Sequence, residues 1–194
     1  MARNLRQEPH HFTIEEYLAL EKASDRRYEY WDGEIVCMSG GTLAHAQISR
    51  NAFRTFDRKL EGRPCEAFTA DMAVRTPAPG QPYLYPDASV VCGGAQVEAV
   101  NGIDSLVNPV LIVEVLSPTT EERDRHEKRL AYQAIPSLRE YLIISQDIPH
   151  VTHYVRDHDT WRRADHSIMD ETLECPALGA VLSLAELYQG VPFE

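Results

Sequence analysis

Glu114 is the residue whose surroundings point most directly to chemistry. It lies inside the apolar run from Pro109 to Leu116, where an ionised carboxylate is costly unless it is paired or bound to a metal. Asp87 follows Pro86 in a second β-prone run, and proline is tolerated mainly at the start or the edge of a strand. Two carboxylates on neighbouring strands offer the hard oxygen ligands that Mg²⁺ prefers. Such an ion can activate water and neutralise the charge that develops on a phosphate.

Lys128 offers a cation for the same site. It lies in a predicted helix over 120–134, on the face that also carries Asp124 and Tyr132. If this helix packs back on the sheet, the ammonium can reach the carboxylates and stabilise a pentavalent phosphate. We expect replacement of Lys128 by alanine to cost little stability. The structural alternatives are a turn residue for Asp87, a buried salt bridge for Glu114 and a solvated side chain for Lys128.

Local patterns predict the elements that must position these side chains. Thr13 and Glu16 form a capping-box pattern at the start of a helix through about residue 22. Asp32-Gly33 separates two β-prone runs within 28–38 and is typical of a type I′ hairpin. A helix is predicted over 42–60, with an apolar face that repeats every four residues. This face consists of Ile48, Ala52, Phe56 and Leu60, and the opposite face carries Arg50, Arg54 and Arg58.

The remaining elements define the fold class. Strand-like runs lie at 65–75, 85–92 and 109–116, and further strands are predicted at 139–145, 151–156 and 160–163. Thr119 to Glu122 offers a second capping box before the helix of Lys128, and a short helix is predicted at 184–188. The order predicts an α/β (α+β) fold, with a mixed central β-sheet flanked by helices and preceded by a β-hairpin. The length of 194 residues suits a single domain over 1–194.

The net charge of −11 narrows the range of partners. Non-specific DNA affinity comes from many lysine and arginine contacts, so the acidity disfavours a general DNA coat more than an enzyme with a small contact patch. No apolar run approaches the ~20 residues of a membrane span, and residues 1–11 lack the apolar core of a signal peptide. We therefore expect a cytoplasmic protein with no membrane partner. Its cysteines are expected to be reduced and mostly buried: Cys37, Cys65, Cys92 and Cys175.

An ordered set of short motifs resembles one group of nucleases. Pro86-Asp87, followed by Glu114 on a hydrophobic strand, resembles the PD-(D/E)XK nuclease superfamily. The wider set, over about residues 11–190, is similar to the Uma-type family of restriction-endonuclease-like proteins. The resemblance implies a restriction-endonuclease-like sheet flanked by helices and a divalent-metal phosphodiesterase chemistry. The matching segments are Arg27-Tyr28-Glu29, Asp32-Gly33-Glu34, Tyr85-Pro86-Asp87, Val113 to Thr119, Asp124 to Tyr132, and Glu140-Tyr141.

One departure from the superfamily concerns the catalytic cation. The third position of the E-x-K triplet is Leu116 rather than lysine. The resemblance implies that the lysine has moved to the next helix, where Lys128 stands. Asp87 and Glu114 are then both catalytic residues and metal ligands, and the backbone carbonyl of Val115 is a further expected ligand.

Glu29 matches an acidic position of the family and could complete the metal shell. The alternative, an ion pair within the hairpin with Arg26 or Arg27, stays open at this point. His45 matches a family histidine and could approach the site or a phosphate, or serve as a capping or surface residue.

Other polar residues give weaker signals. The arginine face of helix 42–60 could follow a nucleic-acid backbone, although a solvated face is the more ordinary role. Cys92 has no evident histidine or acidic partner for a thiol nucleophile. The remaining histidines show no metal-site pattern: His10, His11, His150, His153 and His158.

Together these observations predict a Mg²⁺- or Mn²⁺-dependent endonuclease that hydrolyses DNA. The alternative is a catalytically inactive member of the same fold that binds nucleic acid or another protein. Metal binding discriminates between them, because an inactive module has no need of a charged pocket. A homodimer is expected by analogy, since two sites are convenient for cutting two strands.

Overall fold

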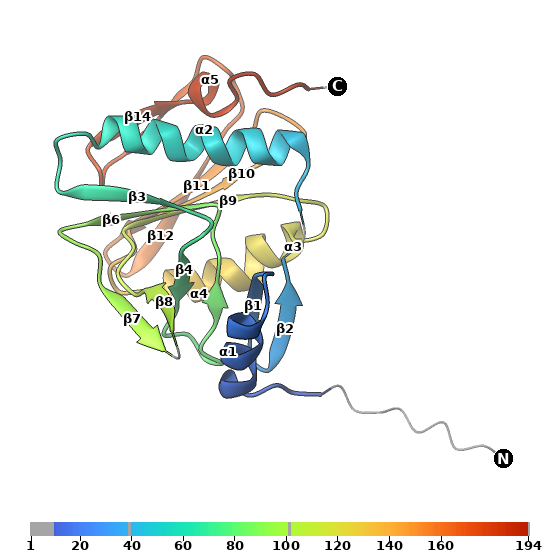
Figure 1. Ribbon diagram of the computed structural model, residues 1–194. Helices are drawn as coiled ribbons and strands as arrows, with labels where there is room; N and C mark the ends of the chain where they lie inside the picture. Colours follow the sequence, from blue (N-terminus) through green and yellow to red (C-terminus); the bar gives the residue numbers. More distant parts are fainter. Residues whose placement is uncertain (1–9, 39, 101, 194) are drawn as a thin grey trace.

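The computed structural model describes residues 10–38, 40–100 and 102–193 (Figure 1). The helices are α1 (Ile14–Ala23), α2 (Leu43–Lys59), α3 (Glu121–Arg123), α4 (Arg129–Gln133) and α5 (Leu184–Leu187), and a π-helical turn, η1 (Asp124–Lys128), joins α3 to α4. The strands are β1 (Tyr28–Trp31), β2 (Glu34–Cys37), β3 (Cys65–Thr69), β4 (Ala73–Arg75), β5 (Tyr83–Leu84), β6 (Ala88–Cys92), β7 (Val97–Val100), β8 (Ile103–Leu106), β9 (Leu111–Val115), β10 (Glu140–Ile144), β11 (Val151–Asp157), β12 (Thr160–His166), β13 (Thr172–Cys175) and β14 (Ala180–Ser183).

A mixed six-stranded sheet, in the order β12-β11-β10-β9-β6-β3, forms the centre of the molecule. Strands β9 and β10 are parallel, with Leu111 beside Glu140. Strands β6 and β9 are antiparallel, with Ala88 opposite Val113. Every residue of β9 and β10 is buried, as expected for strands that are covered on both faces. The mixed central sheet predicted from the sequence is confirmed.

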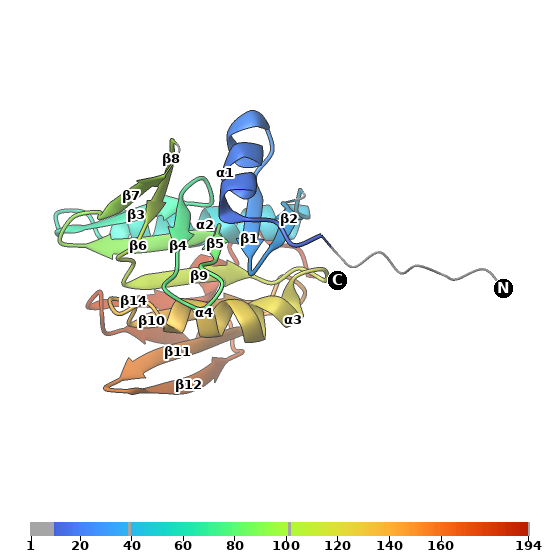
Figure 2. The same cartoon turned by 90° about the horizontal axis from the view of Figure 1, so that it is seen from below.

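Helix α2 covers one face of this sheet, and the segment α3-η1-α4 covers the other (Figures 1 and 2). Thr42 caps α2, because its hydroxyl accepts a hydrogen bond from the amide of His45. The apolar face predicted for this helix is buried against β6, β9 and β10 through Ile48, Ala52 and Phe56. Among the described residues, no helix is long and apolar enough to cross a bilayer.

A second six-stranded sheet, in the order β2-β1-β5-β4-β8-β7, lies beside α1. Its β1–β2 turn has φ values of 42° at Asp32 and 88° at Gly33, which a type I′ turn requires. Tyr17 of α1 packs on Tyr30 and Tyr83 of this sheet. The predicted hairpin and the predicted capping box of α1 are both confirmed.

One predicted strand is divided and another is shortened where the chain crosses from one sheet to the other. The strand predicted over 65–75 is interrupted by a turn in which the Met72 amide donates to the Thr69 carbonyl at 3.1 Å. As a result, β3 belongs to the central sheet and β4 to the second sheet. The strand predicted over 85–92 starts only at Ala88. Strands β7, β8, β13 and β14 were not predicted, and β13 pairs with β14 in a separate two-stranded sheet.

The helix after Ser117 is present, but its predicted capping box is wrong. Thr120 occupies the cap position without a side-chain hydrogen bond to the backbone. Its hydroxyl donates instead to the carboxylate of Asp124 at 2.7 Å. The helix also widens into the π-helical turn η1 rather than continuing as an α-helix. Turns of this kind are rare and occur often at functional sites.

The prediction of four reduced cysteines is wrong. Cys65 and Cys92 lie opposite each other in the β3–β6 pair and form a disulfide. The free thiols of the described chain are the exposed Cys37 and the buried Cys175. The sequence does not predict this disulfide, because its two cysteines are far apart in the chain and become neighbours only through the register of β3 and β6.

Candidate active site

Glu114 lies near the end of β9 and is almost completely buried, with 3% of its surface exposed. It points to the same face of the sheet as Ile112 and Leu116, toward the helix segment that carries Tyr132. The hydroxyl of Tyr132 donates to Glu114 Oε1 at 2.9 Å, and Lys128 Nζ donates to the same oxygen at 3.2 Å. The carboxylate is therefore bound on its inner side by a phenol and an ammonium.

Lys128 is also buried, with 4% of its surface exposed. Its Nζ atom lies 2.7 Å from Glu29 Oε1, 3.2 Å from Glu114 Oε1 and 3.3 Å from Asp124 Oδ1. The π-helical turn holds Asp124 and Lys128 on the inner face of their helix, where both are buried. The structure thus brings Lys128 to Glu114, where the sequence places it, and its catalytic role stays a prediction.

Glu29 reaches this cluster from the second sheet. It lies on β1, and its Oε1 atom accepts a hydrogen bond from the Tyr85 amide at 3.2 Å besides the contact with Lys128. The alternative ion pair within the hairpin is not observed, since Arg27 pairs with Asp71 at 3.1 Å. The two sheets therefore both contribute a carboxylate to one buried group.

Asp87 lies immediately before β6. Continuing the antiparallel register by one residue from Ala88 and Val113 places it opposite Glu114 on the neighbouring strand. Asp87 Oδ2 accepts a hydrogen bond from the Val115 amide at 2.7 Å. Val115 thus contacts Asp87 through its N–H, and a ligand role for its carbonyl stays a prediction.

Helix α2 contacts the same carboxylate from the other face of the sheet. Ser49 Oγ donates to Asp87 Oδ1 at 2.8 Å, and His45 Nε2 lies 3.5 Å from that oxygen. The His45 side chain is 22% exposed, whereas that of Lys128 is 5% exposed. His45 and Asp87 therefore lie on the side of the site nearest to solvent, and Lys128 lies on its buried side.

Carboxylates outnumber cations in this cluster, since Lys128 Nζ contacts Glu29, Glu114 and Asp124, and Asp87 lies close enough to Glu114 to act on its pKa. Burial raises the pKa of Glu114 well above its usual range; Lys128 opposes this rise, and the neighbouring carboxylates add to it. Burial alone would lower the pKa of Lys128, but Glu114, Glu29 and Asp124 raise it well above its usual value. Asp124 Oδ1 is buried and contacts the Lys128 ammonium. A buried excess of carboxylate oxygens fits a divalent cation that prefers oxygen ligands.

Three contacts of the site were not assigned from the sequence. Asp124 and Tyr132 lie four residues before and after Lys128, so the sequence predicts that they share its helix face. It does not predict that Asp124 contacts Lys128 or that Tyr132 contacts Glu114. Ser49 gave no signal, because its contact with Asp87 depends on how α2 lies across the sheet.

The sequence matches the profile of the family Uma2, described as "Putative restriction endonuclease", over residues 14–185. The chain belongs to this family. Two relatives are uncharacterized proteins of Synechocystis sp. The first, slr1290, is 33% identical over 180 residues, which cover 92% of each chain. The second, sll1609, is 33% identical over 147 residues, which cover 76% of this chain and 82% of the relative.

A solved structure supports the fold of the Uma2 chain. It is a crystal structure from Anabaena variabilis, described as a "putative nuclease belonging to DUF820". The two structures have a TM-score of 0.73 over 91% of this chain and 97% of the other, at 20% sequence identity. The Uma2 chain therefore has the restriction-endonuclease-like fold that the sequence resemblance implies.

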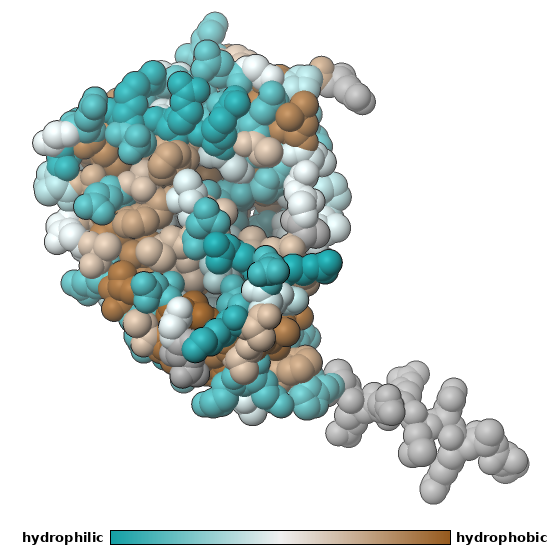
Figure 3. Space-filling model, viewed as in Figure 1, coloured by the Kyte–Doolittle hydropathy of each residue, from teal (hydrophilic) through white to brown (hydrophobic). Residues whose placement is uncertain are grey.

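The arginine face of α2 lies on the surface of the Uma2 chain. Arg50, Arg54 and Arg58 are exposed, and Figure 3 shows a hydrophilic band on the side of the molecule where α2 lies. Arg58 pairs with Glu186 of α5 at 2.6 Å. This pair gives Arg58 a structural contact, and a nucleic-acid role for the face stays a prediction.

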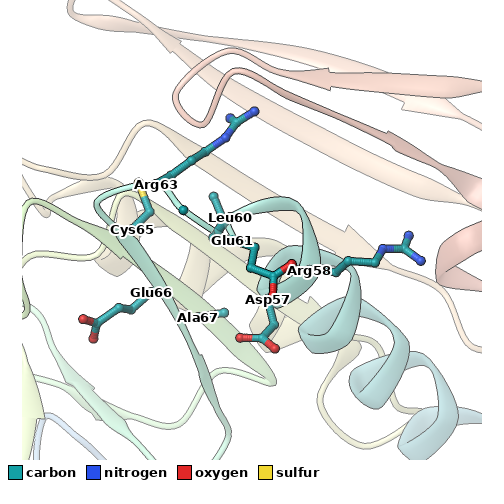
Figure 4. A pocket seen from close by; sticks show the side chains of 9 residues that line it. Asp57, Arg58, Leu60, Glu61, Arg63, Cys65, Glu66 and Ala67 are labelled. Atoms are coloured by element: carbon teal, nitrogen blue, oxygen red, sulfur yellow. The ribbon is translucent and has the colours of Figure 1, made fainter.

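A hollow of about 560 Å³ lies at the C-terminal end of α2 (Figure 4). Charged side chains of both signs line it, and in Figure 4 Arg58, Arg63 and Glu66 spread apart rather than converge. Arg63 also donates to the Gly179 carbonyl at 3.2 Å, which joins this loop to the C-terminal segment. The hollow contains none of Asp87, Glu114 and Lys128.

His153 lies in a group of possible metal ligands, although the sequence gives it no metal-site pattern. Its side chain lies beside those of Glu140 and Cys175, which come from other strands and are also residue types that bind metals. The group was invisible in the sequence because its members belong to β10, β11 and β13.

Proposed function

We propose that this Uma2 chain is a Mg²⁺- or Mn²⁺-dependent endonuclease that hydrolyses phosphodiester bonds of DNA. The observation that carries the proposal is the buried excess of carboxylates around Glu114, with one ammonium, Lys128, held among them. A buried carboxyl in excess of the available cations must take up a proton or bind a metal ion, because an unpaired buried charge is costly. Membership of a family described as restriction endonucleases supports the nuclease class.

Asp87 and Glu114 are the proposed metal ligands, with the carbonyl of Val115 and with Glu29 as a further carboxylate. A bound divalent ion would supply an activated water and neutralise charge on the phosphate. The Val115 amide and Ser49 fix the two oxygens of Asp87, and the Tyr132 hydroxyl fixes Glu114. Such outer hydrogen bonds orient ligating carboxylates.

Lys128 is the proposed catalytic cation. A phosphoryl transition state carries more negative charge on its oxygens than the ground state does, so a fixed ammonium lowers the barrier more than it strengthens binding. Asp124 and Glu29 hold this ammonium beside Glu114. The backbone of the DNA would approach from the side of His45 and Asp87, where the site is least buried.

The test is cleavage of a pool of random-sequence DNA duplexes by the full chain, with Mg²⁺ or Mn²⁺ and with chelator. We expect cleavage only with metal, and a loss of about 100-fold or more for Asp87→Asn and Glu114→Gln, since each removes a ligand charge. Glu174→Gln, an exposed carboxylate on β13, is the matched control and should cleave as the parent does. Absence of cleavage by the parent chain with either metal would overturn the proposal.

The alternative, a catalytically inactive module of the same fold, predicts that the full chain binds no Mn²⁺ at Asp87 and Glu114. It is favoured by the burial of Lys128, whose ammonium already contacts three carboxylates. Calorimetric titration with Mn²⁺ separates the two functions. An enzyme should bind Mn²⁺ through Asp87 and Glu114, and Lys128→Ala should lower turnover while it leaves Mn²⁺ binding intact.

A further inference from the structure

A second group of metal-ligating side chains lies away from the Glu114 cluster. It consists of Glu140 on β10, His153 on β11 and Cys175 at the end of β13, and all three are buried. Glu140 pairs with Leu111, so it lies three residues along the sheet from the level of Glu114, or about 10 Å. Leu111 and Cys175 pack on the α2 side of the sheet, whereas Glu114 points to the other side.

The ligand atoms of this group converge. One carboxylate oxygen, one ring nitrogen and the sulfur all lie within 4.8 Å of one another. His153 Nε2 is 2.7 Å from Glu140 Oε2, and the Ala177 amide donates to the other oxygen of Glu140 at 2.8 Å. The amide holds the carboxylate in one orientation, as outer hydrogen bonds do for ligating groups.

The donor set is specific for a borderline-soft ion. Thiolate, imidazole and carboxylate are the protein ligands of zinc, whereas Mg²⁺ takes oxygen ligands. A carboxylate and a thiolate together carry two negative charges, which one divalent ion balances inside an apolar core. A tetrahedral ion has one further position, which a water molecule or the second oxygen of Glu140 can take.

We propose that Glu140, His153 and Cys175 form a structural zinc site that ties the β13–β14 sheet to the central sheet. Two of the ligands lie on adjacent central strands and the third on the separate two-stranded sheet. The ion therefore links segments that otherwise meet through side-chain packing in the shared core. Burial of all three ligands inside the core keeps a substrate from reaching the ion, so we assign the ion a structural role.

The test uses the full chain, stripped of metal with a chelator and titrated with Zn²⁺ in competition with a chromogenic chelator. We expect one Zn²⁺ to bind at this group, and a fall in its affinity of more than about 100-fold in Cys175→Ser and His153→Gln, because each removes a direct ligand. Cys37→Ser removes the exposed thiol, and Glu174→Gln removes an exposed carboxylate of β13. Both control variants should bind Zn²⁺ as the parent does.

Substitution with Co²⁺ reports the thiolate ligand directly, first in the parent chain and then in the variants. A thiolate ligand in a tetrahedral site gives a sulfur-to-cobalt absorption band, which must be absent in Cys175→Ser and present in Cys37→Ser. Zinc should also raise the melting temperature of the parent, because it binds only the folded state. Failure of the parent to bind Zn²⁺, or equal binding by Cys175→Ser, would overturn the proposal and leave Glu140 and His153 as a hydrogen-bonded pair.

Discussion

At the scale of single residues, the candidate active site depends on one cation shared among several carboxylates. The ammonium of Lys128 contacts Glu29, Glu114 and Asp124. From the sequence, removal of a helical lysine is expected to cost little stability. Its burial reverses that expectation, because the carboxylates that remain have no other cation in contact among the described residues. We therefore expect Lys128 to contribute to stability whether or not it is also needed for catalysis.

We predict that Lys128→Ala in chelator lowers the free energy of unfolding by about 3–5 kcal/mol, the usual cost of leaving buried charge unpaired. Glu114→Gln should unfold at the same or higher urea concentration than the parent, because it removes one of several repelling charges and keeps an acceptor for Tyr132. Urea unfolding of both variants measures this difference. A loss in Glu114→Gln as large as that in Lys128→Ala would show instead that the two residues form a simple buried salt bridge.

At the scale of elements, one carboxylate of α5 forms both of the ion pairs with α2. Glu186 contacts Arg58 at 2.6 Å and Lys59 at 3.1 Å, and it completes the capping box of α5 with Ser183. Partial burial would raise the pKa of Glu186, but the Ser183 amide and Lys59 outweigh it, and the pKa lies below its usual value. Ionised Glu186 therefore stabilises the fold above its unfolded-state pKa, and this contribution is lost as the pH falls through its folded-state pKa.

We predict that Glu186→Gln lowers the free energy of unfolding at pH 7 by about 0.5–1 kcal/mol, in the range of surface ion pairs. At a pH below the folded-state pKa the variant and the parent should be equally stable, because Glu186 is then neutral in both. Urea unfolding at the two pH values measures the effect, and Glu174→Gln provides a control without an ion pair. An equal loss of stability at both pH values would mean that the shape of the Glu186 side chain, rather than its charge, causes the effect.

At the scale of the whole molecule, two features join distant parts of the chain. The candidate active site takes Glu29 from the second sheet, and Asp87 and Glu114 from the central sheet. The disulfide between Cys65 and Cys92 closes a segment with a sequence separation of 27, which includes the crossing between the two sheets. Reduction of this bond should therefore release a loop that contains parts of both sheets.

We predict that reduction of the disulfide lowers the free energy of unfolding by about 3–4 kcal/mol, from the loop-closure entropy of a segment of this length. Urea unfolding with and without reductant measures the loss. The double variant Cys65→Ala/Cys92→Ala should not respond to reductant, whereas Cys37→Ser should respond as the parent does. Equal stability of the parent in both conditions would mean that the β3–β6 pairing alone holds the segment.

The sequence by itself determined the elements with a strong local pattern. The capping box of Thr13 and the Asp32-Gly33 turn act over a few residues, and both are formed as predicted. The apolar period of α2 and the run around Glu114 identified a covering helix and a central strand. These features could be predicted because side chains close in sequence set the backbone conformation and the buried face.

Only the tertiary structure decided which distant residues meet. The Cys65–Cys92 disulfide, the contact of Glu29 with Lys128 and the group around His153 all join different strands or helices. Their formation depends on strand order and register, and a shift of one residue would turn each side chain to the opposite face of its sheet. That register is fixed by the packing of the whole core rather than by any local run. The residues with chemistry could therefore be named from the sequence, but most of their partners could not.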